Sequence, residues 1–484
     1  MVEVGLLCVP GSMPLYEGFG GLPTKAVSKP EDLEGVDLLI IPPGNIVESG
    51  GLGGGLGEAI VEFAEDGGLV LGVCSGLQTL AEEVDTGLRR VEGLGLLRVR
   101  ASRLIGLDPA EVRVVGRSWL TKGLEGRVLK GIHIHTYGRL EGADRRVLES
   151  RLPRHNYFSG PVTIPSGFVS SGGNVVGVLP HKLLDLNPEV RENVLNELGV
   201  RDERALLERN RELVRRLRSE LGVGTGVKVG STRLKEPRPK PKAFAVVSCL
   251  TGEGKTFVTA GLAGLARSAG LEVRVAKLGS DLRDLHPALY LIKEGVDESQ
   301  SILIGTSRGA LGQTRWADSL RRLGEGADLV IVEGVMGVLT GSCRSCGCGA
   351  PCSTLEFLKC SGLPAVLVVS CGRGGVEDAA FRANAYARLL IGEGVRLLAV
   401  IINEVYGGAA EERYLRNALS GLGVPAYLVR MAAVGRHSTP EVDLDLHRYA
   451  LEALRAVGEG VGASGLERML GRAPPLRLGR LNQE

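Results

Sequence analysis

The sequence predicts two doubly wound α/β domains in one chain of 484 residues. Short apolar runs of strand length alternate with segments of helical spacing, as in parallel sheets that are covered on both faces. The stretch 222–241 is rich in glycine and then in lysine and proline, a linker composition that separates two such series. The length also exceeds the roughly 150 residues of an average domain. We therefore place a first domain at 1–200, an amphipathic helix and linker at 201–241, a second domain at 242–470 and a tail at 471–484.

The composition excludes several classes of protein. Hydrophobic residues make up 44% of the chain and charged residues 24%, as in ordinary globular proteins. A net charge of +2 and an aromatic content of 4% give no basis for binding nucleic acid. No apolar run approaches the roughly 20 residues of a membrane span, and the first residues have the pattern of a strand and not of a signal peptide. We expect a cytoplasmic protein without a nucleic-acid or membrane partner.

The first domain contains a turn that is suited to a nucleophile. Its clearest strands are predicted at 2–9, 37–44, 68–74 and 174–179. The third of these strands ends at Cys74, and a helix begins directly after it. Small residues on both sides allow the sharp turn that raises a nucleophile above a sheet edge, and a helix N-terminus favours the thiolate. We expect a catalytic Cys74, the alternative being a buried cysteine beside a glycine turn.

A second turn of this domain is suited to an oxyanion. The strand at 37–44 enters a Pro-Gly turn at Gly44. Backbone N–H groups in such a turn can stabilise an oxyanion. We expect Gly44 and Ser75, the residue after the nucleophile, to form this site.

Residues 201–221 are heavily charged and contain four leucines at helical spacing, Leu206, Leu213, Leu217 and Leu221. This spacing predicts an amphipathic helix that lies on a neighbouring domain. Its basic residues are interpreted as a solvated face.

The second domain begins with a predicted nucleotide site. An apolar strand at 242–248 leads into a glycine-bearing turn, CLTGEGKT, and then into a helix. In such a turn backbone N–H groups and the helix N-terminus face phosphates, with Gly252 and Gly254 giving the backbone access, Lys255 neutralising charge and the Thr256 hydroxyl holding Mg²⁺. Cys249 stands where the usual pattern has its first glycine. The alternative is an ordinary strand-to-helix turn.

Three carboxylates follow predicted strands of this domain. Asp281, Asp284 and Glu333 stand in polar turns after apolar runs. Ligands bind at the carboxyl ends of parallel strands, and carboxylate oxygens suit Mg²⁺. We expect the three to gather near the phosphates, although each by itself is equally consistent with a helix cap or a solvated turn.

A cysteine-rich loop at 341–352 interrupts the pattern. It contains Cys343, Cys346, Cys348 and Cys352, and Cys360 and Cys371 follow farther on. Thiolates this dense suit Zn²⁺ or an iron–sulfur cluster, which we favour. Disulfides and free thiols are the alternatives, and we expect a local staple or a redox sensor.

The first domain resembles the class I glutamine amidotransferase domain of the cobyric acid synthase type. The segments that carry the resemblance are GVCSGLQ at the nucleophile turn, EGLGLL at 92–97, HIH at 133–135 and GVLPHKLLD at 177–185. The resemblance implies that Cys74 attacks the carboxamide of glutamine and that His181 transfers the proton that lets ammonia leave. Ser75 replaces a glycine of the family, and His133 replaces a glutamate. His135 falls on the family's histidine, with a structural role as the alternative to a catalytic one, and Asp185 is the nearest candidate for a third triad member.

The second domain resembles the dethiobiotin synthetase-like domain of cobyrinic acid a,c-diamide synthases. The segments LTGEGKT, KLGSDLRD and VEGVMGVLTG carry this resemblance. It implies phosphate contacts at Gly254, Lys255 and Thr256, Mg²⁺ at Thr256, Asp281 and Glu333, a base contact at Asn403 and a substrate contact at Asp284. Thr340 and Leu282 depart from the family pattern, and the two domains stand in reversed order.

Together these features predict an ATP- and glutamine-dependent amidoligase. ATP would phosphorylate a carboxylate of a tetrapyrrole, of the cobyrinic acid or sirohydrochlorin type, and ammonia released at Cys74 would attack the acyl phosphate after passing between the domains. We keep a homodimer as one expectation for the oligomeric state. Two alternatives remain, a P-loop ATPase that carries a metal centre on its cysteine loop, and a regulatory descendant that has lost synthesis.

Overall fold

The computed structural model describes residues 2–157, 159–230, 240–305, 314–344, 346–432, 434 and 444–476. These residues form two compact α/β units, which confirms the predicted fold class. Unit 1 comprises Met1–Gly226 with the short segments Lys293–Val296 and Thr439–His447, and unit 2 comprises the remainder. The division after Gly226 falls within the predicted linker. Residues 231–239 of that linker and 477–484 of the predicted tail lie outside the described residues.

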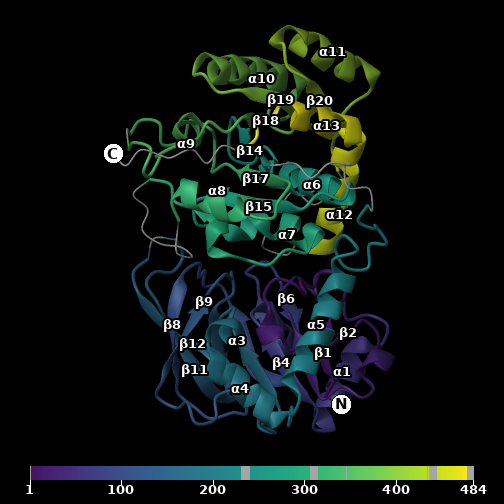
Figure 1. Ribbon diagram of the computed structural model, residues 1–484, viewed down its shortest axis with the longest axis vertical. Coiled ribbons are helices and arrows are strands. Elements are labelled where there is room, and N and C mark those ends of the chain that lie inside the picture. The colour runs from purple at the N-terminus through teal and green to yellow at the C-terminus, as the bar shows by residue number, and fades with distance from the viewer. Residues whose placement is uncertain are drawn as a thin grey trace. The chain divides into compact units, whose positions relative to one another are not determined.

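Unit 1 is built on a mixed sheet of nine strands (Figure 1). Five neighbouring strands are parallel, in the order β2 (Lys25–Val27), β1 (Val4–Leu7), β3 (Leu38–Ile41), β4 (Leu69–Val73) and β13 (Val175–Val178). The sheet continues with antiparallel strands, β12 (Val162–Val169), β11 (Arg145–Leu152), β8 (Pro109–Val114) and β9 (Val128–Ile132). The predicted parallel pattern therefore holds for the first five strands, and the antiparallel half was not predicted.

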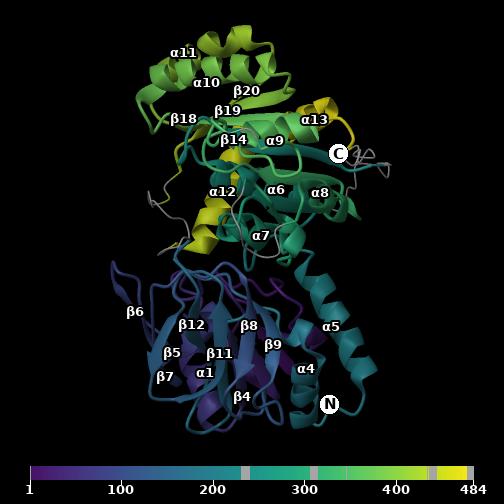
Figure 2. The same cartoon turned by 90° about the vertical axis from the view of Figure 1, so that its left-hand side faces the viewer.

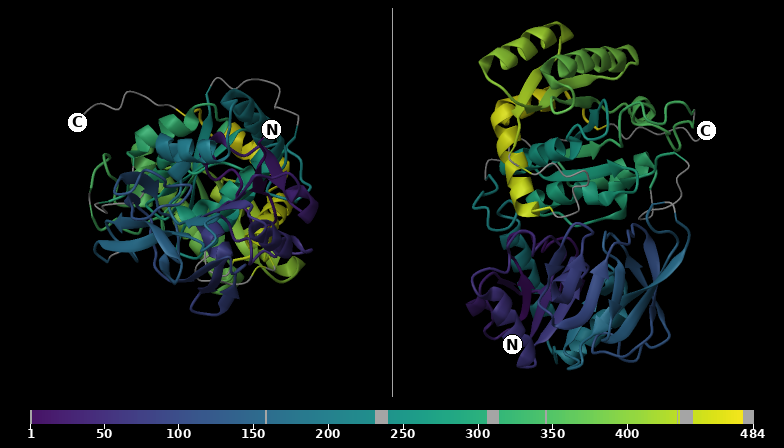
Figure 3. Two further views of the ribbon diagram at one scale, coloured as in Figure 1. Left: turned by 90° about the horizontal axis from the view of Figure 1, so that it is seen from below. Right: turned by 180° about the vertical axis from the view of Figure 1, so that it is seen from behind.

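A smaller sheet and the helices complete unit 1. The sheet has the order β10 (Arg139–Gly142), β7 (Leu97–Ser102), β5 (Ala81–Asp85) and β6 (Arg90–Glu92). Strands β5, β6 and β7 are labelled in Figure 2, and Figure 3 gives two further views of the ribbon. The helices are α1 (Leu56–Glu65), α2 (Ser75–Leu80), α3 (Leu183–Leu186), α4 (Pro188–Glu197) and α5 (Glu203–Leu217), with 3-10 turns η1 (Phe19–Gly21) and η2 (Pro30–Leu33). Helix α5 is the predicted amphipathic helix. It packs on unit 1 itself, where Asn210 donates to the Pro23 carbonyl at 2.8 Å and Arg209 to the Val2 carbonyl at 2.9 Å.

The register of the unit 1 sheet determines where its turns meet. Strands β4 and β13 are parallel neighbours, with Val73 opposite Val178. Cys74 and Leu179 therefore leave the sheet side by side at its carboxyl edge. His181 follows two residues later and exchanges backbone hydrogen bonds with Ile132 at the end of β9.

Unit 2 is built on a parallel sheet of seven strands. Their order is β16 (Ser301–Ile302), β15 (Val273–Leu278), β17 (Leu329–Glu333), β14 (Lys242–Ser248), β18 (Ala365–Ser370), β19 (Leu397–Val405) and β20 (Ala426–Arg430). The helices are α6 (Lys255–Ser268), α7 (His286–Ile292), α8 (Trp316–Gly324), α9 (Thr354–Ser361), α10 (Gly375–Gly392), α11 (Ala409–Leu419), α12 (Leu446–Gly460) and α13 (Gly462–Arg472), with 3-10 turns η3 (Leu282–Leu285), η4 (Glu298–Gln300) and η5 (Ser420–Leu422). Helices α10 and α11 lie side by side next to β18, β19 and β20 (Figures 1 and 2).

The central strand of unit 2 determines the position of its ligand site. The first strand of the unit in the chain, β14, lies between β17 and β18, and the chain continues on both sides of it. Ligands of open α/β sheets bind at such a point, beyond the carboxyl ends of the strands. The turn after β14 is the predicted phosphate loop. Among the helices that the structure describes, none combines the length and apolar character required to cross a membrane.

Candidate functional site

The first candidate site is the turn between β4 and α2. Cys74 has a φ of 55°, in the left-handed region that side-chain-bearing residues seldom adopt. The turn depends on two glycines, because a Cβ on Gly72 would lie 2.6 Å from the Gly76 carbonyl oxygen and a Cβ on Gly76 would lie 2.1 Å from that of Ile41. The predicted sharp elbow is therefore present. The Cys74 side chain is only 5% exposed, and its Sγ lies 3.7 Å from the Ile134 carbonyl oxygen.

His181 lies beside Cys74 and is oriented by a residue that was not predicted. Its Nδ1 lies 3.1 Å from Oε1 of Glu17, whose Oε2 accepts a hydrogen bond from the Lys182 amide at 2.5 Å. The ring of Tyr16 packs edge-on against the imidazole, with the ring centroids 5.0 Å apart. Because a carboxylate accepts the hydrogen bond from Nδ1, the other ring nitrogen, Nε2, is available for proton exchange with the Cys74 thiol. No signal in the sequence marks Glu17, since it stands 164 residues before the histidine in a loop that matches no motif.

The electrostatics of this site favour a charged histidine. Burial lowers the pKa of His181, but the charge and hydrogen bonding of Cys74, and then Glu17, raise it to about 10. Among the described residues no conventional hydrogen bond reaches Nε2 of His181, and the Cys74 thiol is the nearby group that raises the pKa of the imidazole most. The arrangement places a cysteine, a histidine and a carboxylate in sequence, as in sites that activate a thiol nucleophile.

Asp185, the predicted candidate for a third triad member, does not contact the histidine. Its two oxygens accept hydrogen bonds from the backbone N–H groups of Gly18 and Gly20, at 2.8 and 2.7 Å. It therefore fixes the loop that begins directly after Glu17. Asp185 thus contributes to the site indirectly, by holding the loop that positions the carboxylate of Glu17.

His133 and His135 form a buried pair next to the elbow. Nδ1 of His133 lies 2.9 Å from Nε2 of His135, and Nδ1 of His135 lies 3.0 Å from the Leu104 carbonyl oxygen. A carbonyl can only accept, so His135 carries its proton on Nδ1 and accepts from His133 through Nε2. Burial, and then the charges of His135 and His181, lower the pKa of His133 well below its usual value. These contacts support the structural role that was considered for His135.

The predicted oxyanion residues are in direct contact. The backbone N–H of Gly44 donates a hydrogen bond of 2.7 Å to the hydroxyl of Ser75. Gly44 has a φ of 146°, and a Cβ there would lie 2.1 Å from the Gly11 carbonyl oxygen. The two residues that were predicted for one site are thus joined next to Cys74, through the side chain of Ser75.

The second candidate site is the turn between β14 and α6 in unit 2. Gly252 and Gly254 have φ values of 79° and 84°, so both depend on the freedom of glycine. Lys255 donates to the Ser248 hydroxyl at 2.9 Å and to the Met336 carbonyl at 2.7 Å. Burial, followed by the charge of Lys277, lowers the pKa of Lys255 to about 8.

Thr256 and Glu333 meet beside this turn. The Thr256 hydroxyl donates to Oε1 of Glu333 at 2.9 Å, and among the described residues Oε2 of Glu333 has no hydrogen-bond partner. Burial raises the pKa of this carboxylate. A hydroxyl and a carboxylate with an unused buried oxygen are hard donors that fit Mg²⁺.

Lys277 joins one of the remaining predicted carboxylates to this group. Its Nζ lies 2.7 Å from Glu333 and 2.6 Å from Asp284. Asp281 forms an ion pair with the buried Arg283 at 2.7 Å. The structure therefore brings Thr256, Glu333 and Asp284 together and pairs Asp281 with Arg283.

Asn403 lies against the predicted phosphate loop. Its side-chain amide donates to the Glu253 carbonyl at 3.2 Å, and a Cβ on Gly254 would lie 2.1 Å from its Nδ2. Arg373, from the loop after β18, lies above the same turn and donates to the Gly252 carbonyl at 3.3 Å. Sequence reasoning missed Arg373, which belongs to no motif that was considered.

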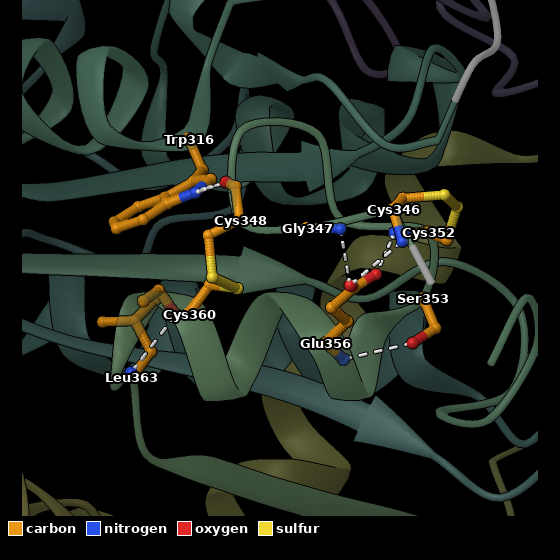
Figure 4. The surroundings of a disulfide bond; sticks show 10 residues. Trp316, Cys346, Gly347, Cys348, Cys352, Ser353, Glu356, Cys360 and Leu363 are labelled. Carbon is orange, nitrogen blue, oxygen red and sulfur yellow. Dashed lines mark hydrogen bonds between the residues drawn. A yellow bond between two sulfur atoms is a disulfide. The ribbon is translucent and has the colours of Figure 1, made fainter. Parts of the chain in front are cut away.

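The cysteine loop contains disulfides, so the favoured metal or cluster is not supported (Figure 4). Cys346 is bonded to Cys352, and Cys348 to Cys360, while Cys343 is free and exposed. Among the described residues no group of three or more His, Cys, Asp or Glu side chains is arranged to hold a metal ion. Disulfides were the alternative at the sequence level.

Two further side chains hold this loop, Glu356 and Trp316. The carboxylate of Glu356 on α9 accepts backbone hydrogen bonds from Gly347 at 3.0 Å and Cys352 at 2.6 Å. The Trp316 indole donates to the Cys348 carbonyl at 2.8 Å. Figure 4 shows that these contacts tie the second half of the loop to helices α8 and α9, which agrees with the expected local staple.

Comparison with known proteins supports the reading of unit 1. Residues 23–188 match the family model of the CobB/CobQ-like glutamine amidotransferase domain. The chain is 33% identical over 192 residues to the hydrogenobyrinate a,c-diamide synthase of Mycobacterium bovis, covering 38% of each chain. It is 32% identical over 236 residues to the protein of that name from Rhizobium meliloti, covering 47% of this chain and 51% of the relative. The matches thus span two fifths to one half of these curated relatives.

Two solved structures illustrate a distant similarity. The cell division protein FtsY of Thermotoga maritima is 20% identical and gives a TM-score of 0.28, with 55% of this chain and 82% of that chain covered. The signal recognition particle receptor FtsY of Elizabethkingia anophelis is 15% identical with a TM-score of 0.29, with 55% and 78% covered.

Proposed function

We propose that unit 1 is a glutaminase. The observation that carries this proposal is the carboxylate of Glu17 on Nδ1 of His181, next to a cysteine in a strained elbow. The Cys74 thiolate would attack the carboxamide carbon of glutamine, forming a C–S bond and a tetrahedral oxyanion. As this intermediate collapses, the C–N bond breaks, His181 gives its proton to the leaving nitrogen, and ammonia departs. Water then hydrolyses the thioester to glutamate and restores the thiol.

We further propose that unit 2 binds ATP and activates a carboxylate. The turn after β14 would hold the phosphates by its backbone N–H groups, with Lys255 as the neutralising charge. Thr256 and Glu333 would hold Mg²⁺, which neutralises phosphate charge when bound. A carboxylate oxygen of the acceptor would attack the terminal phosphorus of ATP, so that ADP leaves and an acyl phosphate forms. Lys277, paired with Asp284 and Glu333, would keep these carboxylates oriented.

The two activities combine into an ATP- and glutamine-dependent amidoligase. Ammonia would replace the phosphate of the acyl phosphate and give a carboxamide. The names of the relatives, hydrogenobyrinate a,c-diamide synthases, support a carboxylate-bearing tetrapyrrole of the cobalamin pathway as acceptor. The alternative of a metal-carrying ATPase loses its support, because four cysteines of the loop region are bonded to one another.

The test uses glutamine labelled with ¹⁵N in its side-chain amide. Wild-type protein with ATP, Mg²⁺ and hydrogenobyrinate is expected to give ADP, glutamate and a labelled tetrapyrrole amide by mass spectrometry. Cys74→Ala should abolish glutamate formation and should still amidate the acceptor when ammonium replaces glutamine. Glutamate formation that is unchanged in Cys74→Ala would exclude the glutaminase. Glutaminase activity without ATP turnover on any tetrapyrrole carboxylate would exclude the ligase.

A further inference from the structure

We propose that the side-chain hydroxyl of Ser75 is the donor that stabilises the oxyanion in this chain. This inference rests on the proposed glutaminase activity. The family that the sequence resembles has a glycine at this position, which has no side chain to donate. In that family a backbone amide would therefore have to donate its hydrogen bond to the oxyanion directly.

The structure shows why the Gly44 amide is not free for that role. Its N–H donates to Oγ of Ser75 at 2.7 Å. The loop around Gly44 is held on both sides, because the Asn45 amide donates to the Gly11 carbonyl at 2.9 Å and the Met13 amide donates to the Pro43 carbonyl at 2.7 Å. Gly44 is also closely packed, because a Cβ there would lie 2.1 Å from the Gly11 carbonyl oxygen. The amide is therefore fixed on the serine oxygen.

Ser75 retains a proton that it can donate. A hydroxyl has one donor and two acceptor lone pairs, and the Gly44 amide uses one lone pair. The structure gives this hydroxyl proton no acceptor among the described residues. A hydroxyl that accepts from an amide is polarised and becomes a stronger donor. Gly44 would thus support the oxyanion indirectly, through Ser75.

The chemistry at Cys74 calls for a donor at this place. When the thiolate attacks the carboxamide carbon, the π electron pair moves to oxygen, and the new negative charge lies within reach of groups next to the nucleophile. Ser75 is the residue after Cys74 and the first of α2. Its backbone is fixed as well, since the Thr79 hydroxyl donates to the Ser75 carbonyl at 2.9 Å. The hydroxyl hydrogen-bonds to the oxyanion and transfers no proton.

The alternative role of the Gly44–Ser75 hydrogen bond is to block the oxyanion site. If Ser75 only covered the Gly44 amide, the serine would have to rotate away before glutamine could react. The two roles predict opposite effects of removing the hydroxyl. Removal of a donor slows the reaction, by roughly 10²-fold for one oxyanion donor. Removal of a block accelerates it.

The test is steady-state glutaminase kinetics on the full-length chain with Ser75→Ala, Ser75→Gly and Ser75→Thr. We expect Ser75→Ala to lower kcat by roughly 10²-fold with KM nearly unchanged, and Ser75→Thr, which keeps a hydroxyl, to stay within a few-fold of wild type. Ser75→Gly should lie between them, because it uncovers the Gly44 amide. A kcat of Ser75→Ala equal to or above that of wild type would overturn the proposal.

A binding measurement keeps the proposal testable if turnover is lost for other reasons. The aldehyde analogue of glutamine adds to the thiol and forms a tetrahedral adduct, which mimics the intermediate. Ser75→Ala should weaken this adduct by a factor similar to the loss in kcat, while binding of the product glutamate stays unchanged. Equal weakening of both ligands would instead indicate a damaged pocket and would also overturn the proposal. Wild-type protein with no more activity than Cys74→Ala would remove the glutaminase and this inference together, which separates that failure from the first.

Discussion

Glu17 and His181, which are 164 residues apart in the chain, meet at 3.1 Å beyond the carboxyl edge of the unit 1 sheet. The loop that carries the acid is fixed by Asp185, four residues after the histidine, through the amides of Gly18 and Gly20. Glu17 thus belongs to the first loop of the domain. The segment that contains His181 also contains Asp185, which holds that loop in place.

The Glu17→Gln variant tests this contact. Glutamine has the same shape but cannot accept the Nδ1 proton with a full charge, so the tautomer and the protonated state of His181 lose their support. We expect kcat of the glutaminase to fall roughly 10²-fold or more. Glu31→Gln, at an exposed position, is the matched control and should behave as wild type. A Glu17→Gln enzyme with full activity would show that the carboxylate is dispensable.

The titration of His181 should appear in the stability of the fold. Its pKa of about 10 in the folded chain exceeds the value of about 6.5 in the unfolded chain, so the proton is held more tightly when the chain is folded. The stabilisation is complete below about pH 6.5 and is lost as pH rises through about 10. We expect the difference in Tm between wild type and His181→Asn to shrink steadily over this interval. A difference that stays constant from pH 6 to 10 would contradict the raised pKa.

Nucleotide binding should be coupled to proton uptake at Lys255. Its pKa of about 8 leaves part of the population neutral near pH 8, and phosphate charges placed next to the amine raise that pKa. We therefore expect ADP to draw a fraction of a proton from the buffer at pH 8. Calorimetric titration in buffers of different ionisation enthalpy measures this number, with Arg396→Lys as a remote control. An enthalpy that is the same in every buffer would argue against it.

The disulfides predict a definite count of thiols. Alkylation of the unfolded chain without reductant should modify the five free cysteines, Cys8, Cys74, Cys249, Cys343 and Cys371, and reduction should add the other four. The Cys348→Ser/Cys360→Ser variant opens a loop with a sequence separation of 12 and should lose about 2–3 kcal/mol of stability. Cys343→Ser is the matched control. Nine modified cysteines without reductant, accompanied by release of zinc or iron, would restore the metal site that we favoured from the sequence.

Much of the fold was predictable because local patterns determine it. The apolar runs that end at Cys74 and before Gly252 are buried parallel strands, and buried strands of this kind are written continuously in the sequence. The antiparallel strands were missed because they alternate between exposed and buried residues, as in the run Val112–Val114 of β8, and such short alternation is easily taken for loop.

The candidate sites were predictable where spacing carries the chemistry. Lys255 and Thr256 follow from the pattern of the predicted phosphate loop alone, and Cys74 from the glycines around it. Glu17 could not be found in this way, since its role depends on the folding of one loop onto a distant strand end. The pairing of the cysteines was equally hidden, because a dense run of thiols has the same spacing pattern whether it binds metal or oxidises.

The contact between Gly254 and Asn403 constrains how this chain can vary. A methyl group on Gly254 would lie 2.1 Å from the Asn403 amide nitrogen, and that glycine already has a φ of 84°. Neither position can be enlarged independently of the other. In a set of homologous sequences the two positions should therefore covary, with any larger residue in the loop matched by a smaller one on the strand.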